Sequence, residues 1–194
     1  MVNIEKEDGL KLFSLFYKTS NYWILENKKN YKRKDNISRK EQVIIKIYNK
    51  ILYNYLVNND YKEKFFKSPD KILSVIKYKN YWLRGYFDGD GCLNVRKRKN
   101  TFNCCLSFSS NINQNWNFLI KIMEKLNLKS FKIIKRRKNY GSCSIFKSES
   151  IIESKKILIL IYKNFEIDNI GLLRKYKKFI VLNNYKLLKK SKYE

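Results

Sequence analysis

Two carboxylates and three glycines are concentrated in one nine-residue stretch of this chain, Leu83 to Gly91. The stretch begins with apolar residues, ends with Asp88-Gly89-Asp90-Gly91, and holds three of the six glycines among 194 residues. Carboxylate oxygens are the ligands that Mg²⁺ prefers, and bound Mg²⁺ can activate water and stabilise a leaving oxygen. Glycines at this density indicate a backbone that closely approaches another group, or a helix that ends abruptly. The stretch therefore predicts oxygen-ligand metal chemistry.

Apolar spacing and alternation predict the elements that position this stretch. From the stretch onward we expect a helix at 79–88, strands near 93–95 and 101–109, a helix at 113–126, a hairpin at 130–135 and 142–147, and helices at 150–164 and 170–189. Before it we expect a helix at 9–18, a strand at 22–26, a helix at 40–56, a strand at 62–67 and a short helix that begins at Pro69. This is a mixed α+β order, α-β-β-α-β-β-α-α from residue 79.

The charge of the chain indicates a polyanionic partner. The net charge is +26, from 43 Lys and Arg against 17 Asp and Glu. An AT-rich gene would also raise the number of lysines, but it does not explain why the positive charges have so few acidic partners. Because unbalanced charge repels itself within a compact fold, a nucleic acid that neutralises it is the favoured partner. Hydrophobic residues make up 44% of the chain, which is enough for a core.

Cysteine and apolar patterns exclude two other classes of protein. The four cysteines form no CxxC pair and the chain has no histidine, so we expect no zinc site and mostly buried, reduced thiols. No apolar run approaches the ~20 residues of a membrane span, and the longest is 157–162. The partly acidic N-terminus resembles neither a secretory signal nor a transit peptide, which favours a mitochondrial, organelle-encoded protein.

A faint repeat precedes the glycine-rich stretch. Residues 12–20 align with 83–91 without a gap, and residues 43–51 align with 118–126. In this alignment Thr19 stands opposite Asp90, and Lys18 stands opposite Gly89. Chance similarity between apolar helices remains an alternative to a decayed duplication.

Leu83–Gly91, the element order after it and the closing segment Leu173–Phe179 are similar to those of the LAGLIDADG homing endonuclease family. The resemblance implies two pseudo-symmetric αββαββα halves with antiparallel sheets that form a saddle on a nucleic-acid duplex, here with the first half shortened. It places a degenerate half at 1–78 and an intact half at 79–194. A monomer with pseudo-twofold symmetry is favoured over a homodimer that would pair two copies of 79–91.

The resemblance also implies roles for individual residues. Asp90 takes the metal-ligand position, with Mg²⁺ as the cofactor of an active enzyme, and Asp88 is expected to be structural. Gly85 and Gly89 take the helix-contact positions, and Lys135 is the candidate for a basic catalytic residue near the scissile phosphate. The predicted nucleic-acid contacts are Arg96, Lys97, Arg98, Lys99, Lys132, Lys135, Arg136, Arg137 and Lys138.

Two functions are consistent with these residues. Because Thr19 is a poor metal ligand, the chain carries half of a catalytic centre in this alignment. We therefore favour a cleavage-impaired protein that binds structured RNA, as an organellar ribosome component or an intron maturase. The alternative is a Mg²⁺-dependent, site-specific DNA endonuclease or nickase that uses Asp90. No membrane partner is expected.

Overall fold

The computed structural model describes residues 2–5, 21–27, 42–60, 68–97, 102–138 and 141–185. The chain divides into two compact units, Met1–Lys62 and Glu63–Glu194. The predicted first copy of the motif at 12–20, the helix at 9–18 and the strand at 62–67 lie outside the described residues. Arg98, Lys99 and residues 186–194 also lie outside them.

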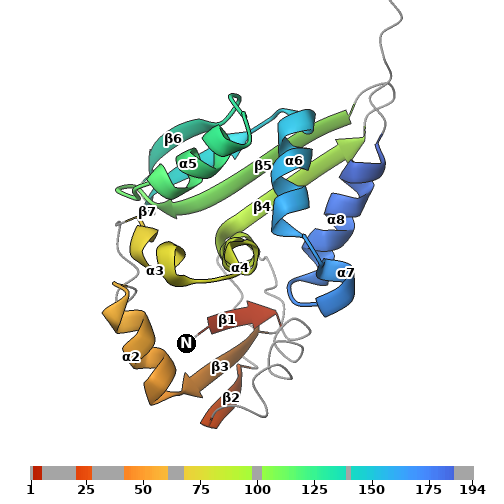
Figure 1. The fold of residues 1–194 in the computed structure, drawn as a ribbon. Helices are drawn as coiled ribbons and strands as arrows, with labels where there is room; N and C mark the ends of the chain where they lie inside the picture. Colours follow the sequence, from red (N-terminus) through yellow and green to blue (C-terminus); the bar gives the residue numbers. More distant parts are fainter. Residues whose placement is uncertain are drawn as a thin grey trace, which may run out of the picture. The chain divides into compact units, whose positions relative to one another are not determined.

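The described part of the first unit is an antiparallel sheet followed by a helix (Figure 1). Strands β1 (Val2–Glu5), β2 (Asn21–Asn27) and β3 (Gln42–Tyr48) take the order β1-β3-β2. Helix α2 (Lys50–Asn58) begins after Asn49, whose side chain accepts a hydrogen bond from the Leu52 N–H over 2.9 Å. Such an N-cap satisfies one of the backbone donors that a helix leaves unpaired at its start.

The helix predicted over residues 40–56 is wrong for its first half. Gln42–Tyr48 is the central strand of the sheet and pairs with both β1 and β2. The helical spacing of Val43, Ile44 and Ile47 was ambiguous, because a run of β-branched residues also suits a strand with a partner on each side. The helix begins only after the cap at Asn49.

This correction changes the internal repeat. Residues 43–48 are a strand, whereas residues 118–125 lie in helix α5, so the alignment of 43–51 with 118–126 is wrong. The strand pairing gives a different correspondence: Asn21 pairs with Tyr48 in the first unit as Gly91 pairs with Phe108 in the second. In each unit the hairpin is followed by a helix, so α2 is the counterpart of α5.

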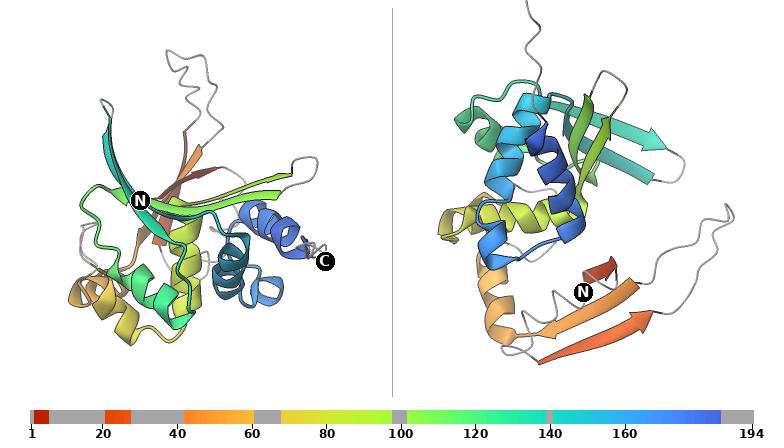
Figure 2. Two further views of the ribbon diagram at one scale, coloured as in Figure 1. Left: turned by 90° about the horizontal axis from the view of Figure 1, so that it is seen from above. Right: turned by 90° about the vertical axis from the view of Figure 1, so that its right-hand side faces the viewer.

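The second unit places helices on one face of a four-stranded antiparallel sheet (Figure 2). The strands are β4 (Gly91–Lys97), β5 (Phe102–Asn111), β6 (Lys132–Lys138) and β7 (Gly141–Ser148), in the order β4-β5-β7-β6. The helices are α3 (Asp70–Val75), α4 (Lys79–Asp90), α5 (Asn117–Lys125), α6 (Ile151–Ile161), α7 (Phe165–Asp168) and α8 (Leu173–Asn184). The element order predicted from residue 79 is confirmed, with α7 as an additional short helix.

The core of the second unit lies between the sheet and these helices. Phe87 of α4 packs edge-on against Phe108 of β5, with ring centroids 5.4 Å apart. The core also contains many other large apolar residues, among them Leu83, Leu106, Phe118, Leu119, Phe146, Ile157, Leu158, Ile161 and Leu182. Burial of this much apolar surface is the main stabilising contribution to the unit. Among the helices of the described residues, none has the length and apolarity that a bilayer span needs.

The junction between α4 and β4 requires a glycine. A Cβ atom at Gly91 would lie 2.1 Å from Phe87 Cδ2 and 2.4 Å from the Phe87 carbonyl oxygen. The φ angle of Gly91 is −87°, so the constraint is lack of space and not backbone conformation. The glycine lets the chain turn from helix to strand directly over a buried ring.

We therefore expect Gly91→Ala to lower the free energy of unfolding by about 2–3 kcal/mol, because overpacking at a buried site forces the ring and backbone to move. Urea denaturation measures this change. The control is Cys92→Ala at the next, exposed position of β4, where a change within about 0.5 kcal/mol is expected. Equal effects of the two substitutions would contradict the steric explanation.

Candidate metal-binding helix end and nucleic-acid interface

Asp90 is the last residue of α4, and its side chain is exposed. Helix α4 is buried along Leu83, Arg84 and Phe87, so the opposite side of the helix and its C-terminal end are accessible. An exposed carboxylate at this place is a suitable ligand for a hard divalent cation such as Mg²⁺. No group of three or more His, Cys, Asp or Glu side chains that could hold a metal ion occurs among the described residues. Asp90 by itself offers one exposed carboxylate ligand at this helix end.

Asp88 has a different environment from Asp90. Its Oδ2 accepts a hydrogen bond from the Leu172 N–H over 2.8 Å, at the N-terminus of α8. A carboxylate there satisfies an unpaired backbone donor and lies at the positive end of the helix dipole. The contact requires Gly171, whose φ is +131° and whose Cβ, if present, would lie 2.8 Å from Asp88 Oδ2. Asp88 thus joins α4 to α8.

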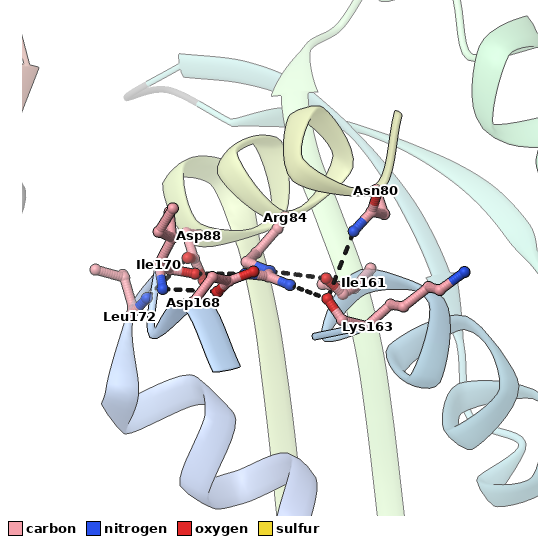
Figure 3. A network of polar contacts seen from close by, with 8 residues as sticks. All are labelled: Asn80, Arg84, Asp88, Ile161, Lys163, Asp168, Ile170 and Leu172. Atoms are coloured by element: carbon pink, nitrogen blue, oxygen red, sulfur yellow. Dashed lines mark hydrogen bonds and ion pairs between the residues drawn. The ribbon is translucent and has the colours of Figure 1, made fainter. Parts of the chain in front are cut away.

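Arg84 is buried, with 1% of its side chain exposed, and joins α4 to α6 and to the segment before α8 (Figure 3). Its Nε donates to the Ile161 carbonyl over 2.9 Å, and a terminal nitrogen donates to the Lys163 carbonyl. The other terminal nitrogen donates to Asp168 Oδ1 over 2.9 Å and to the Ile170 carbonyl over 2.7 Å. A guanidinium group has no acceptor function, and here every one of its nitrogens donates to an oxygen.

Lys175 of α8 is buried against the C-terminal end of α4, with 6% of the residue's surface exposed. Burial lowers the pKa of Lys175 to about 8, and the negative charges of Asp88 and Asp90 partly oppose this shift. The side chain is therefore still mainly protonated at neutral pH. Neither Arg84 nor Lys175 was identified in the sequence as a functional residue, because a lysine or arginine in this composition is indistinguishable from the many surface cations.

Gly85 and Gly89 lie one helical turn apart on the exposed side of α4. A Cβ atom at either position would have nothing within 4 Å among the described residues. That side of the helix has room for a close neighbour. The role of the two glycines in a helix interface remains a prediction.

The strand register assigns the sheet residues of the second unit to two faces. Leu106, Phe108, Ser144 and Phe146 point into the helix-covered core and are buried. The residues between them alternate onto the open face, as expected for strands with one buried side. The open face carries Cys92, Asn94, Arg96, Asn103, Cys105, Ser107, Ser109, Asn111, Lys132, Ile134, Arg136, Cys143, Ile145 and Lys147.

The predicted basic contacts divide between the two faces. Arg96, Lys132 and Arg136 lie on the open face and are exposed, and the backbone of Lys138 pairs with Gly141. Lys135 pairs with Ser144 and therefore lies on the helix-covered side, exposed at the edge strand. The backbone of Lys97 pairs with Phe102, and that of Arg137 pairs with Ser142. The hairpin predicted at 130–135 and 142–147 is confirmed with longer strands, since β6 continues through Lys138 and β7 begins at Gly141.

Lys147 is an open-face cation that the sequence prediction missed. One row across the sheet runs Cys92, Ser107, Lys147, Lys132, and it begins two residues after Asp90. Lys147 Nζ lies 2.6 Å from Glu149 Oε1, and this contact raises the pKa of Lys147 and lowers that of Glu149. Side chains alternate between the two faces along residues 142–147, so Lys147 could have been assigned to the open face if the sequence had shown which face is open.

A hollow of about 470 Å³ lies at the β4–β5 end of the sheet. Its polar lining includes the amides of Asn94 and Asn103, the guanidinium of Arg96 and the carboxylate of Glu149. Amide and guanidinium groups can hydrogen-bond to base edges. Cys104 and Cys105 also line it, and burial raises the pKa of both thiols. All four cysteines are free, but only Cys104 is buried, so the expectation of mostly buried thiols is wrong.

Comparison with known proteins identifies the family. The family model described as LAGLIDADG endonuclease matches residues 83–184, more than half of the chain. This chain belongs to the LAGLIDADG endonuclease family, and the predicted resemblance is confirmed. LAGLIDADG endonucleases depend on divalent metal ions. No curated protein sequence matches the chain.

Solved structures confirm the fold. The LAGLIDADG homing endonuclease I-LtrWI bound to target DNA is 14% identical with a TM-score of 0.50, over 94% of this chain and 77% of that one. I-GzeII in complex with its DNA target is 13% identical with a TM-score of 0.53, over the same shares of the two chains. The chain spans only 34% of I-AabMI, with 19% identity and a TM-score of 0.36 over 54% of this chain. At these identities the first two likenesses establish the fold, in agreement with the predicted fold class.

The buried ammonium of Lys175 predicts a pH-dependent stability. Its pKa of about 8 in the folded chain is below the ordinary value of 10.5, so between these pH values the unfolded chain holds a proton that the folded chain has released. Rising pH then favours the folded state by up to about 1 kcal/mol per pH unit. Urea denaturation at pH 7 to 10 should show wild type gaining stability relative to Lys175→Met above pH 8.

The control for this experiment is Leu182→Ala, which removes a buried apolar group from the same helix. Its loss of stability should be constant over the same pH range, because no titrating group is removed. If the difference in unfolding free energy between wild type and Lys175→Met is also independent of pH, the lowered pKa assigned to Lys175 is contradicted.

Proposed function

We propose that this protein binds duplex DNA on the open face of the β4-β5-β7-β6 sheet and cuts one strand with the help of Asp90. The observation that carries the proposal is the exposed carboxylate at the end of α4, next to the row of open-face side chains that begins at Cys92. The solved relatives I-LtrWI and I-GzeII are bound to DNA, which supports duplex DNA as the partner. Because these relatives have low sequence identity to this chain, the DNA sequence that it recognises must be found by experiment.

The open face has the side chains that a duplex requires. Arg96, Lys132, Arg136 and Lys147 provide positive charge for phosphates, and neutralising phosphates releases counterions from the duplex. The amides of Asn94, Asn103 and Asn111 on the same face can donate to and accept from base edges. Cations that bind phosphates position the duplex, and amides that contact base edges read its sequence. Together they support a sequence-selective surface for duplex DNA.

Asp90 would hold a divalent ion at the scissile phosphate. When bound there, Mg²⁺ supplies an activated water and neutralises charge on the leaving oxygen. The chain itself contributes the carboxylate, its fixed place at the helix end and the cations that hold the duplex. Thr19 stands opposite Asp90 in the sequence alignment, and Ser20 stands there if Asn21 corresponds to Gly91 as the strand pairing indicates. Because neither residue is a carboxylate, cleavage of a single strand is proposed in place of a double-strand break.

The second candidate function is binding of structured RNA without cleavage, as an organellar ribosome component or an intron maturase. The net charge of +26 favours it, since the charge exceeds what the open-face residues alone account for. A mitochondrial, organelle-encoded origin belongs to this candidate as a further proposal.

Cleavage distinguishes the two candidates. A supercoiled plasmid that carries the DNA flanking the gene should be converted by wild type and Mg²⁺ to the nicked circular form and not to the linear form. Asp90→Asn should reduce nicking at least 100-fold while binding the same plasmid, because it removes the metal ligand but no phosphate contact. Nicking that persists in Asp90→Asn, or tight RNA binding without any nicking by wild type, would contradict the endonuclease proposal.

Neighbouring residues of β6 provide a matched test of the DNA surface. Arg136→Gln should weaken plasmid binding and lower the slope of log affinity against log salt by about 1, as for loss of one phosphate contact. Lys135→Gln removes an equal charge from the other face of the strand. The plasmid affinity of this variant, and the salt dependence of that affinity, should therefore stay near the wild-type values. Salt titrations by fluorescence anisotropy measure both, and a larger effect at Lys135 would show that Lys135 contacts the duplex and would contradict the assigned face.

A further inference from the structure

The ammonium group of Lys175 contacts the backbone on both sides of Asp90. Its Nζ donates to the carbonyl oxygens of Phe87 over 2.7 Å, Asp88 over 2.8 Å and Gly91 over 2.6 Å. An ammonium has three N–H donors, and all three have an acceptor here. The Nζ also lies 5.0 Å from the centre of the Phe87 ring.

These contacts fix a part of the helix that is ordinarily loose. The last carbonyls of an α-helix have no partner within the helix, and helix ends fray. Of the three acceptors, the Asp88 carbonyl belongs to this last turn, the Phe87 carbonyl also accepts from the Gly91 N–H, and the Gly91 carbonyl lies just beyond the helix. The cation thus lies at the negative end of the helix dipole and links the last turn of α4 to the first residue of β4. Because two of the acceptors precede Asp90 and one follows it, the backbone of Asp90 is held between fixed points.

The contacts come from a helix that is itself held in place. Lys175 lies in the first turn of α8, whose start is joined to Asp88 through the Leu172 N–H. Phe179 and Leu182 of the same helix are buried in the core. The ammonium therefore acts from a rigid position and not from a mobile surface side chain.

We propose that Lys175 is a positioning residue for Asp90. It holds the end of α4 so that the carboxylate has one direction toward the metal and the scissile phosphate. Lys175 touches neither the metal nor the substrate in this role. The proposal depends on the proposed function for its catalytic consequence, but the ordering of Asp90 is a property of the chain alone.

A purely structural role is the alternative, in which Lys175 only stabilises the fold. Lys175→Met keeps most of the length of the side chain and removes all three donors. Leu182→Ala is the matched control, because it removes a buried apolar group seven residues further along the same helix and no hydrogen-bond donor. Both variants are studied at a temperature where denaturation curves show that they are fully folded.

The first measurement is ¹⁵N relaxation of the Asp90 and Gly91 amides in the protein without DNA. Order parameters of about 0.85 are expected in wild type and Leu182→Ala, with a fall toward 0.6 in Lys175→Met. Order that is unchanged in Lys175→Met would overturn the proposal. This measurement needs no cleavage, so it separates failure of the positioning proposal from failure of the proposed function.

The second measurement is the dependence of plasmid nicking on Mg²⁺ concentration. Lys175→Met should raise the Mg²⁺ concentration for half-maximal nicking, or lower the maximal rate, about 10–100-fold, as loss of a residue behind a metal ligand does. Its plasmid affinity should stay at the wild-type value. Nicking by Lys175→Met equal to that of Leu182→Ala would overturn the proposal, whereas absence of nicking in wild type would reject only the proposed function.

Discussion

Three helix ends of the second unit meet and satisfy one another with charged side chains. The carbonyls at the end of α4 accept from Lys175, those at the end of α6 accept from Arg84, and the start of α8 donates to Asp88. Each charge has the sign that the helix dipole favours at that end. Each also satisfies backbone groups that burial would otherwise leave unpaired at a cost of about 1–3 kcal/mol per group.

This arrangement explains how two buried cations are tolerated in a protein of such high positive charge. A buried charge is costly unless hydrogen bonds compensate for its lost hydration. Arg84 and Lys175 find compensation mainly in carbonyl oxygens, with Asp168 as the carboxylate partner of Arg84. Because Arg84 joins α4 to α6, and Lys175 and Asp88 join α8 to α4, the same interactions fix α4, α6 and α8 relative to one another.

The separation of functions follows from this arrangement. The buried side of α4 serves packing and capping, while its exposed side and end retain Gly85, Gly89 and Asp90 for contacts beyond the core. The sheet divides in the same manner, with an apolar face against the helices and a polar, cationic face without them. A single family motif thus contributes both a structural residue, Asp88, and a candidate metal ligand, Asp90.

The sequence by itself determined the family, the element order after residue 79 and the place of Asp90, because these depend on local patterns of apolar residues, glycines and acids. It did not distinguish strand from helix at Gln42–Tyr48, because a short run rich in β-branched residues fits either form. The pairing of this segment with β1 and β2 made it a strand. Only the tertiary structure separated Arg136 from Lys135 and revealed the roles of Arg84, Lys147 and Lys175. The reason is physical: strand register decides the face of a side chain, and a buried cation is recognised only by the distant carbonyls that surround it.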